Sequence, residues 1–118
     1  MNGIRNSVRL IGNLGAAPEL KDLDKGTKMA RVNIATTDYY TDKKGEKQKE
    51  TQWHTLVAWG KTAELMIELT DKGTEIAVEG KLVNRSYEKD GEKKYITEVV
   101  VQEFAVLGKR AAVAEEQP

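Results

Sequence analysis

The sequence predicts an all-β domain, a small closed sheet of five strands with one short helix between the third and fourth strands. Three observations support this fold class. Apolar and polar residues alternate along most of the chain, as they do in strands with one buried face. Only one stretch has helical spacing, and two glycine-containing turns separate strand-like runs. The length of 118 residues suits one domain with a hydrophobic core.

The first two strands are predicted in residues 6–14 and 28–40. In both, Arg and Asn residues stand between apolar ones, so one face is expected to be buried and the other solvated. Arg31 and Asn33 mark the polar face of the second strand. The apolar positions are Val8, Leu10 and Leu14 in the first strand and Ala30, Val32 and Ile34 in the second.

The third strand, TQWHTLVAW at residues 51–59, holds both tryptophans and the only histidine of the chain. Trp53 and Trp59 share one face, and they are about 20 Å apart at the usual rise of a strand. The opposite face carries His54, Leu56 and Ala58. Because Leu56 and Ala58 already provide an apolar face, we expect the indoles to project outward.

The helix is predicted in KTAELMIELTDKG, residues 61–73. Leu65, Met66 and Leu69 recur there at helical spacing, and Gly73 follows as the expected C-terminal stop. A helix at this point of the chain can cover one end of a closed sheet.

The last two strands are predicted in residues 75–87 and 95–107, joined by an Asp-Gly turn at 90–91. The apolar positions of the fourth strand are Ile76, Val78 and Leu82, and the run from Val99 to Val101 indicates a strand buried on both sides. Periodicity ends after Gly108. We therefore assign the domain to residues 1–108 and a short flexible C-terminal tail to residues 109–118.

This order of elements is the layout of the OB-fold, a five-stranded Greek-key barrel that commonly binds oligonucleotides or oligosaccharides. An open sheet with a helix on one face is the alternative that fits the same pattern.

Catalysis finds little support in the sequence. There is no cysteine, and His54 is alone, so neither a thiolate site nor a histidine pair is available for a metal. GNLG at residues 12–15 lacks the spacing and the lysine of a phosphate-binding loop. Glu75, Glu79 and Glu98 lie on strands, where a paired-acid site is one alternative, but we interpret them as carboxylates of solvated strand faces and surface pairs. We therefore expect that the protein is not an enzyme and that it has no catalytic residue, no metal and no cofactor.

The aromatic residues indicate a binding surface instead. Trp53 and Trp59 are expected outside the barrel, and Tyr87 shares the face of Arg85 in the fourth strand. Tyr40 closes the second strand, and we place it on the face of Arg31 and Asn33. Exposed aromatic rings beside basic side chains are typical of proteins that bind single-stranded nucleic acids, because unpaired bases stack on the rings and phosphates contact Lys and Arg.

The formal charge of zero, from 19 basic and 19 acidic residues, does not exclude this function, because the distribution of charge matters more than its sum.

Five blocks of sequence are jointly specific: GNLG-x-x-PE, T-x-WH, WGK-x-AE, KG-x-x-x-x-VEG-x-L and Y-x-TEVVV. In this order, between about Asn6 and Gly108, they resemble the bacterial single-stranded DNA-binding protein family. The resemblance implies a homotetramer of OB-folds, a dimer of dimers, around which single-stranded DNA wraps during replication, recombination and repair.

The resemblance also implies roles for single residues. Base stacking falls to Tyr40, Trp53, Trp59 and Tyr87, and contacts with the DNA backbone fall to Lys43, Lys49, Lys61, Lys72 and Arg85. We add Arg31 and Asn33 to the nucleic-acid-binding residues because they lie on the same polar faces. Subunit contacts are implied for His54 and for the first strand with Asn6, Val8 and Leu10. A hydrogen-bonded core histidine is the alternative for His54.

Family members usually continue to an acidic tip that ends in a hydrophobic residue and recruits other DNA-processing proteins. The last residues here, AAVAEEQP, lack such a tip, so we expect no recruitment by this route. No secretory signal and no apolar run of about 18 residues is present, so we expect a cytoplasmic, nucleoid-associated protein without a membrane partner. Two alternatives remain open: a related OB-fold protein of replication restart or RNA binding, and a metal-dependent OB-fold nuclease.

Overall fold

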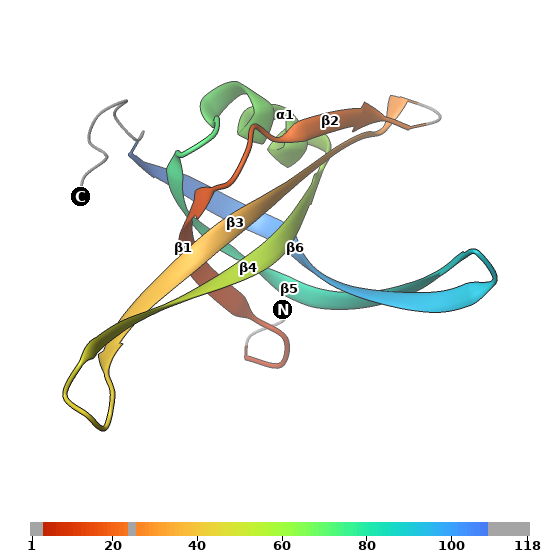
Figure 1. The fold of residues 1–118 in the computed structure, drawn as a ribbon. Coiled ribbons are helices and arrows are strands. Elements are labelled where there is room, and N and C mark those ends of the chain that lie inside the picture. The colour runs from red at the N-terminus through yellow and green to blue at the C-terminus, as the bar shows by residue number, and fades with distance from the viewer. Residues whose placement is uncertain (1–3, 24–25, 109–118) are drawn as a thin grey trace.

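A computed structural model describes residues 4–23 and 26–108, which form one closed sheet and one helix (Figure 1). Five long strands build the barrel, and the helix α1 (Gly60–Leu69) follows the third of them. These strands are β1 (Val8–Leu14), β3 (Lys28–Thr41), β4 (Lys47–Trp59), β5 (Glu75–Lys89) and β6 (Glu92–Gly108).

The sheet closes in the order β1-β5-β6-β4-β3, and β3 returns to β1 through the pairs Asn13–Ala35 and Leu14–Ile34. All neighbouring strands are antiparallel except β4 and β6, which pair in parallel at Leu56–Val99 and Val57–Val100. This closure confirms the predicted barrel and contradicts the open sheet.

One further strand was not predicted. β2 (Glu19–Asp22) pairs with the beginning of β3 outside the barrel ring. All four of its residues are exposed, so no face is buried and the sequence ELKD carries no alternation that could reveal a strand.

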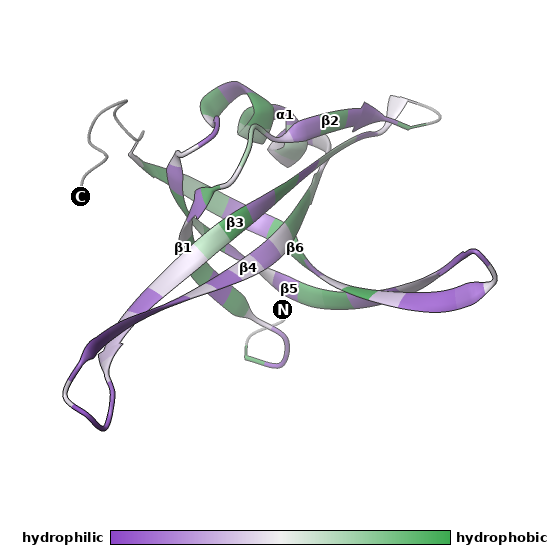
Figure 2. Ribbon diagram, viewed as in Figure 1, coloured by the Kyte–Doolittle hydropathy of each residue, from purple (hydrophilic) through white to green (hydrophobic). Residues whose placement is uncertain are grey.

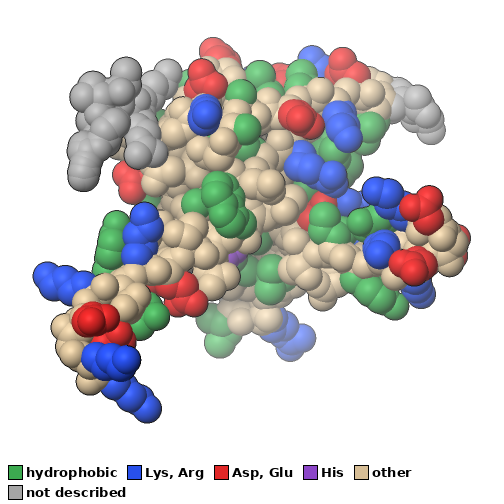
Figure 3. Space-filling model, in the orientation of Figure 1, with side chains coloured by type: hydrophobic (Ala, Val, Ile, Leu, Met, Phe, Trp, Pro, Cys, Tyr) green, Lys and Arg blue, Asp and Glu red, His purple; other side chains and the backbone are tan. Residues whose placement is uncertain are grey.

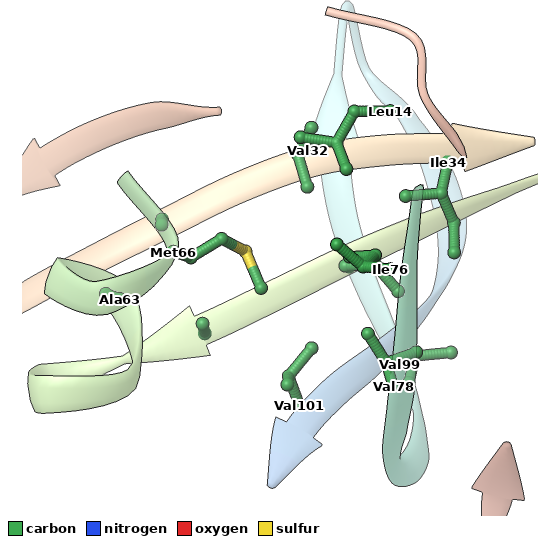
Figure 4. Close-up of a cluster of buried hydrophobic side chains, with 12 residues drawn as sticks. Leu14, Val32, Ile34, Ala63, Met66, Ile76, Val78, Val99 and Val101 are labelled. Atoms are coloured by element: carbon green, nitrogen blue, oxygen red, sulfur yellow. The ribbon is translucent and has the colours of Figure 1, made fainter. Parts of the chain in front are cut away.

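The core fills the barrel with alternate residues from every long strand, as predicted for the first three strands (Figure 4). Leu14, Ile34, Leu56 and Ile76 are almost fully buried. Met66 extends from α1 into this cluster, and hydrophobic residues are concentrated where the strands cross (Figure 2). The helix therefore covers one end of the barrel, where its single buried methionine fills the opening.

The helix differs from the prediction in two respects. Of its three predicted apolar positions only Met66 is buried, whereas Leu65 and Leu69 are exposed. The helix α1 rests on the barrel through the buried Ala63 and Met66 and the half-buried Ile67. Gly73 is also not its C-terminal stop. The helix ends at Leu69. Gly73, at φ 88°, lies in a later turn, and its N–H donates to the Leu14 carbonyl at 2.8 Å.

The β3–β4 and β5–β6 hairpins continue beyond the barrel as two arms that point in different directions (Figure 1). Leu82, predicted in the apolar face, is 45% exposed although its partner Val99 is buried, because it lies where the β5–β6 arm leaves the barrel. The arms end in ordered turns. Asp42 accepts backbone hydrogen bonds from Lys44 and Glu46 at 2.9 Å, and the bond from Glu46 is the main cause that lowers the pKa of Asp42.

In the described part of the chain, no helix is long and apolar enough to cross a membrane.

Met66→Ala should lower the free energy of unfolding by about 2–5 kcal/mol, because it removes a fully buried side chain from the end of the barrel. Leu69→Ala, in the same helix but exposed, is the matched control and should change it by less than about 1 kcal/mol. Urea denaturation measures both values. Equal losses in the two variants would show that α1 packs differently.

Candidate nucleic-acid interface

The two tryptophans of β4 lie on the outside of the barrel, as predicted. Trp53 is 61% and Trp59 44% exposed, whereas Leu56 and Ala58 on the other face are fully buried. His54 is half-buried on the inner face and lies 2.9 Å from the Thr36 hydroxyl through its Nε2 atom. The indoles are therefore surface groups, and His54 matches the hydrogen-bonded alternative; its role in subunit contacts stays a prediction.

Trp53 lies in a shallow groove between β3 and the segment that follows β1. Gly15 of this segment contacts the indole so closely that an added Cβ would lie 2.7 Å from Cζ3 and 2.9 Å from Cη2. The Gly15 N–H donates to the Asn33 carbonyl at 3.0 Å, which holds the segment against β3. The glycine thus lets a backbone segment support the ring, a contact that sequence reasoning did not identify.

Trp59 borders a second hollow, formed by the outer faces of β3, β4, β5 and β6. It stands at the last position of β4, and its extended backbone begins α1. Arg31 lines both hollows and pairs across the ladder with Val57, between the two tryptophans. Arg31 is therefore placed between the two proposed stacking rings.

Glu98 contradicts the sequence interpretation of a solvated carboxylate, because it is only 3% exposed. Arg85 donates to it through Nε and Nη2, both at 2.9 Å, and Arg31 donates through Nη2 at 2.8 Å. A buried carboxylate requires such partners. One signal was available in the sequence. Glu98 is two residues from Val100, so it shares the outer face of a valine run that was predicted to be buried on both sides.

These contacts set the charge at the centre of the face. The hydrogen bonds and charge of Arg85, and then the charge and hydrogen bond of Arg31, lower the pKa of Glu98, although burial acts in the opposite direction. Glu98 in turn raises the pKa of Arg85. Two guanidinium groups and one carboxylate leave one net positive charge, and both arginine side chains remain partly exposed.

Tyr87 continues this face along the β5–β6 arm. It is 49% exposed and lies at two-residue steps from Arg85 and Val83, which border the hollow of Trp59. The structure therefore brings Trp53, Trp59, Tyr87 and the two arginines onto one continuous outer surface.

The placement of Tyr40 on the face of Arg31 and Asn33 is wrong. The β3–β4 ladder runs without interruption from Met29–Trp59 to Thr41–Lys47, so alternate residues keep to one face along its whole length. Tyr39 shares the face of Arg31, and Tyr40 lies on the opposite one. Tyr40 is an odd number of residues away from Arg31, and no bulge interrupts the ladder to change the face on which it lies.

The predicted lysines are all exposed, but they occupy separate places. Lys49 is on β4, Lys43 in the turn of the β3–β4 arm, and Lys61 next to Trp59 in the first turn of α1. Lys72 is in the turn after α1, beside Gly73. Figure 3 shows basic, acidic and apolar side chains side by side on both arms.

Apart from His54, the predicted interface residues lie on β1 or just before it. The Asn6 side chain donates to the Leu82 carbonyl and accepts from its N–H, so it extends the pairing of β1 with β5 within this chain. Val8 and Leu10 are half-buried. Among residues 4–23 and 26–108, no three His, Asp or Glu side chains gather as metal ligands would.

A closed OB barrel with exposed aromatic and basic side chains across its outer face defines an OB-fold binding module of the nucleic-acid type. The model of the single-strand binding protein family matches residues 5–107, and the chain belongs to this family.

Similar proteins include two named single-stranded DNA-binding protein 1. The one from Xylella fastidiosa (strain 9a5c) is 43% identical over 107 residues, which cover 89% of this chain and 79% of that protein. The one from Chlorobaculum tepidum is 39% identical over 105 residues, covering 87% of this chain and 65% of that protein. The chain thus spans less than two thirds of the second relative.

Two solved structures resemble this fold. The Plasmodium falciparum SSB complex with ssDNA has a TM-score of 0.79 and 29% identity, covering 86% of this chain and 94% of that one. A deletion mutant of the single-stranded DNA binding protein from Thermus aquaticus has a TM-score of 0.78 and 36% identity. The match covers 89% of this chain and 51% of that one. These similarities confirm the predicted OB-fold.

Glu98→Gln should lower the free energy of unfolding by about 1–3 kcal/mol at pH 7, because the charge-assisted bonds to Arg31 and Arg85 are weakened. The folded-state pKa of Glu98 is lowered, so the carboxylate stabilises the fold above its ordinary pKa, and this contribution is lost as the pH falls through the lowered value. The difference between wild type and variant should therefore narrow in acid.

Urea denaturation at a series of pH values measures this effect. Glu79→Gln is the control, since Glu79 pairs with the exposed Arg9 at 3.4 Å and should contribute little. A Glu98→Gln variant as stable as wild type at pH 7 would contradict the stabilising role of the bonds between Glu98 and the two arginines.

Proposed function

We propose that this chain binds single-stranded DNA largely without sequence specificity. The observation that carries the proposal is the pair Trp53 and Trp59, which project from one outer face with Arg31 between them. Bases would stack on these rings and on Tyr87, while the exposed parts of Arg31 and Arg85 contact phosphates. Stacking reads no base edges, so every base is accepted.

Single strands fit this surface better than duplexes, because only unpaired bases offer a free face to an indole. The helix also argues against reading of a major groove, since α1 packs on the barrel end and exposes Glu64 and Glu68. We propose a non-enzymatic role, in which the protein protects and organises single strands during DNA replication, recombination and repair, in the cytoplasm and at the nucleoid.

Self-association is part of this proposal. β1 pairs with β3 only at Asn13 and Leu14 in the described residues, so its edge from Val8 to Gly12 is available to a second copy. A largely apolar groove crosses the outside of β1, β5 and β6, where Ile11 is 58% exposed. We propose that these two surfaces join four copies as a dimer of dimers.

The C-terminal residues 109–118, assigned above to a tail, lie outside the described residues.

Ile11→Glu should dissociate the assembly, because it places a charge in the apolar groove. Light scattering of the wild type should give four times the chain mass, and Leu69→Glu, on the exposed side of α1, is the control. A wild-type monomer at micromolar concentration would contradict the proposed assembly.

Trp53→Ala and Trp59→Ala should each weaken the binding of oligothymidine by about 1–3 kcal/mol, the range measured for stacked bases in proteins such as OB-fold single-strand binders. The phenylalanine variants at the same positions retain an aromatic face and serve as controls. Fluorescence anisotropy measures the affinity, and tryptophan fluorescence should be quenched by single strands and not by duplex.

Unchanged affinity in both alanine variants would contradict the site. Competition with RNA of matched sequence distinguishes DNA binding from the alternative of an RNA-binding relative, and tighter binding of RNA would favour that alternative.

A further inference from the structure

We propose that Glu98, together with Glu19, determines which polyanions the face around the two tryptophans selects. The two carboxylates neutralise Arg31 and Arg85, so the centre of this face attracts phosphates weakly and distinguishes ligands by their unstacked bases. Both carboxylates act through the arginines and are positioning residues. The inference rests on the proposed function and deepens it, because it names what the same face excludes: duplexes and other polyanions without free bases.

The charges that line the two hollows cancel. Arg31 and Glu19 are the charged residues that line the groove of the first tryptophan, within the described part of the chain. In the hollow of the second tryptophan, Arg31 is joined by Arg85 and Glu98. None of the predicted lysines lines either hollow. The centre of the face therefore combines two arginines with two carboxylates, and the lysines lie elsewhere on the surface.

Glu98 is held too firmly for a phosphate to displace it. Its side chain is 3% exposed and accepts bonds of 2.8 Å from Arg31 and 2.9 Å from Arg85. A phosphate that drew the arginines away would leave a buried carboxylate without partners, which is strongly unfavourable. The ion pairs therefore persist when a polyanion approaches, and Glu98 continues to offset their charge.

The geometry of these bonds also limits what the arginines can offer to a ligand. Arg85 directs Nε and Nη2 together at Glu98, and such a paired edge is what a guanidinium uses to bind a phosphate through two bonds. The Nε atom of Arg31 is buried and has no hydrogen-bond partner among the described residues. Only the remaining Nη hydrogens are left for phosphates.

Glu19 adds the second carboxylate at the edge of the face. It lies on β2, directly opposite Arg31 in the ladder between β2 and β3, and it is exposed. Salt screens an exposed charge more than a buried one, so Glu19 should have a smaller effect than Glu98. The strand β2 has no buried face, and this position gives it a role: it carries a carboxylate to the groove.

A centre without net charge separates single strands from other polyanions. A duplex presents phosphates but no free base, so it binds this face through charge alone. A single strand also gains from stacking on Trp53 and Trp59, which does not depend on the charge between them. Loss of a carboxylate should therefore strengthen the binding of a duplex, or of inorganic polyphosphate, more than that of a single strand.

Glu98→Gln keeps the shape of the side chain and removes its charge. The slope of log K against log salt concentration should become steeper by about 0.7 for oligothymidine and by about 0.9 for a duplex of equal length, as for one more phosphate contact. At one low salt concentration, duplex affinity should rise about two- to fivefold. Oligothymidine affinity should rise less, because the freed arginines must be ordered again when the strand binds.

Three further variants separate charge from fold. Glu19→Gln should steepen both slopes in the same direction by less. Glu98→Asp keeps the charge on a shorter side chain and should keep the wild-type slopes, even where its bonds weaken. Glu68→Gln removes an equal charge from the exposed side of α1, outside both hollows, and should change neither slope. Anisotropy titrations over a series of salt concentrations measure the slopes, with inorganic polyphosphate as a competitor, and circular dichroism checks that each variant is folded.

Unchanged slopes in Glu98→Gln and Glu19→Gln would overturn the inference. So would an equal loss of affinity for single strand, duplex and polyphosphate in Glu98→Gln, which a purely structural role predicts. If Glu98→Gln does not fold, the slopes of Glu19→Gln decide alone. In each of these cases the wild type still binds oligothymidine, so the proposed function stands. If the wild type binds no oligothymidine, the proposed function fails, and the inference fails with it.

Discussion

The alternation of side chains along a closed sheet is the constraint on which the rest of this structure depends. Inside the barrel the fully buried inward positions are apolar, and Leu14, Ile34, Leu56 and Ile76 are almost completely excluded from solvent. Every second residue is then forced outward, whatever its chemistry. Trp53 and Trp59 occupy outward positions of β4 for this reason, and the barrel fixes both their direction and their separation.

The buried carboxylate of Glu98 adds a second constraint to the same outer face. Its partners come from β3 and β5, while Glu98 itself belongs to β6, so three strands are joined across the outside of β4. These bonds already restrict the rotamers of Arg31 and Arg85 before any ligand arrives. The two side chains therefore lose less conformational entropy when a ligand binds. Glu98 neutralises half of the combined charge of the two arginines. The face is therefore rigid, and its electrostatic attraction for phosphates is modest.

The order of the elements, the core positions and the outward direction of both tryptophans could be predicted from the sequence, because each depends on local periodicity. The partners of Glu98, the contact of Gly15 with Trp53 and the strand β2 could not. The partners of Glu98 are 13 and 67 residues away along the chain, and the contact of Gly15 with Trp53 depends on how a separate segment crosses the barrel. The exposure of Leu65 was missed because helical spacing defines an apolar stripe but not the width of the surface that receives it.

The arms show why a formal charge of zero is compatible with a nucleic-acid surface. Beyond the barrel no core distinguishes the two faces of a hairpin, so nothing in hydrophobic patterning tells them apart. In the β3–β4 arm the sign of the charge does so: Lys47 and Lys49 lie on one face, and Asp38 and Glu50 on the other. Opposite charges cancel in the sum but are separated by the thickness of a single sheet. A strand one position out of step would exchange the two faces. The register, which long pairing with β4 holds in place, therefore decides which side chains lie on the basic face.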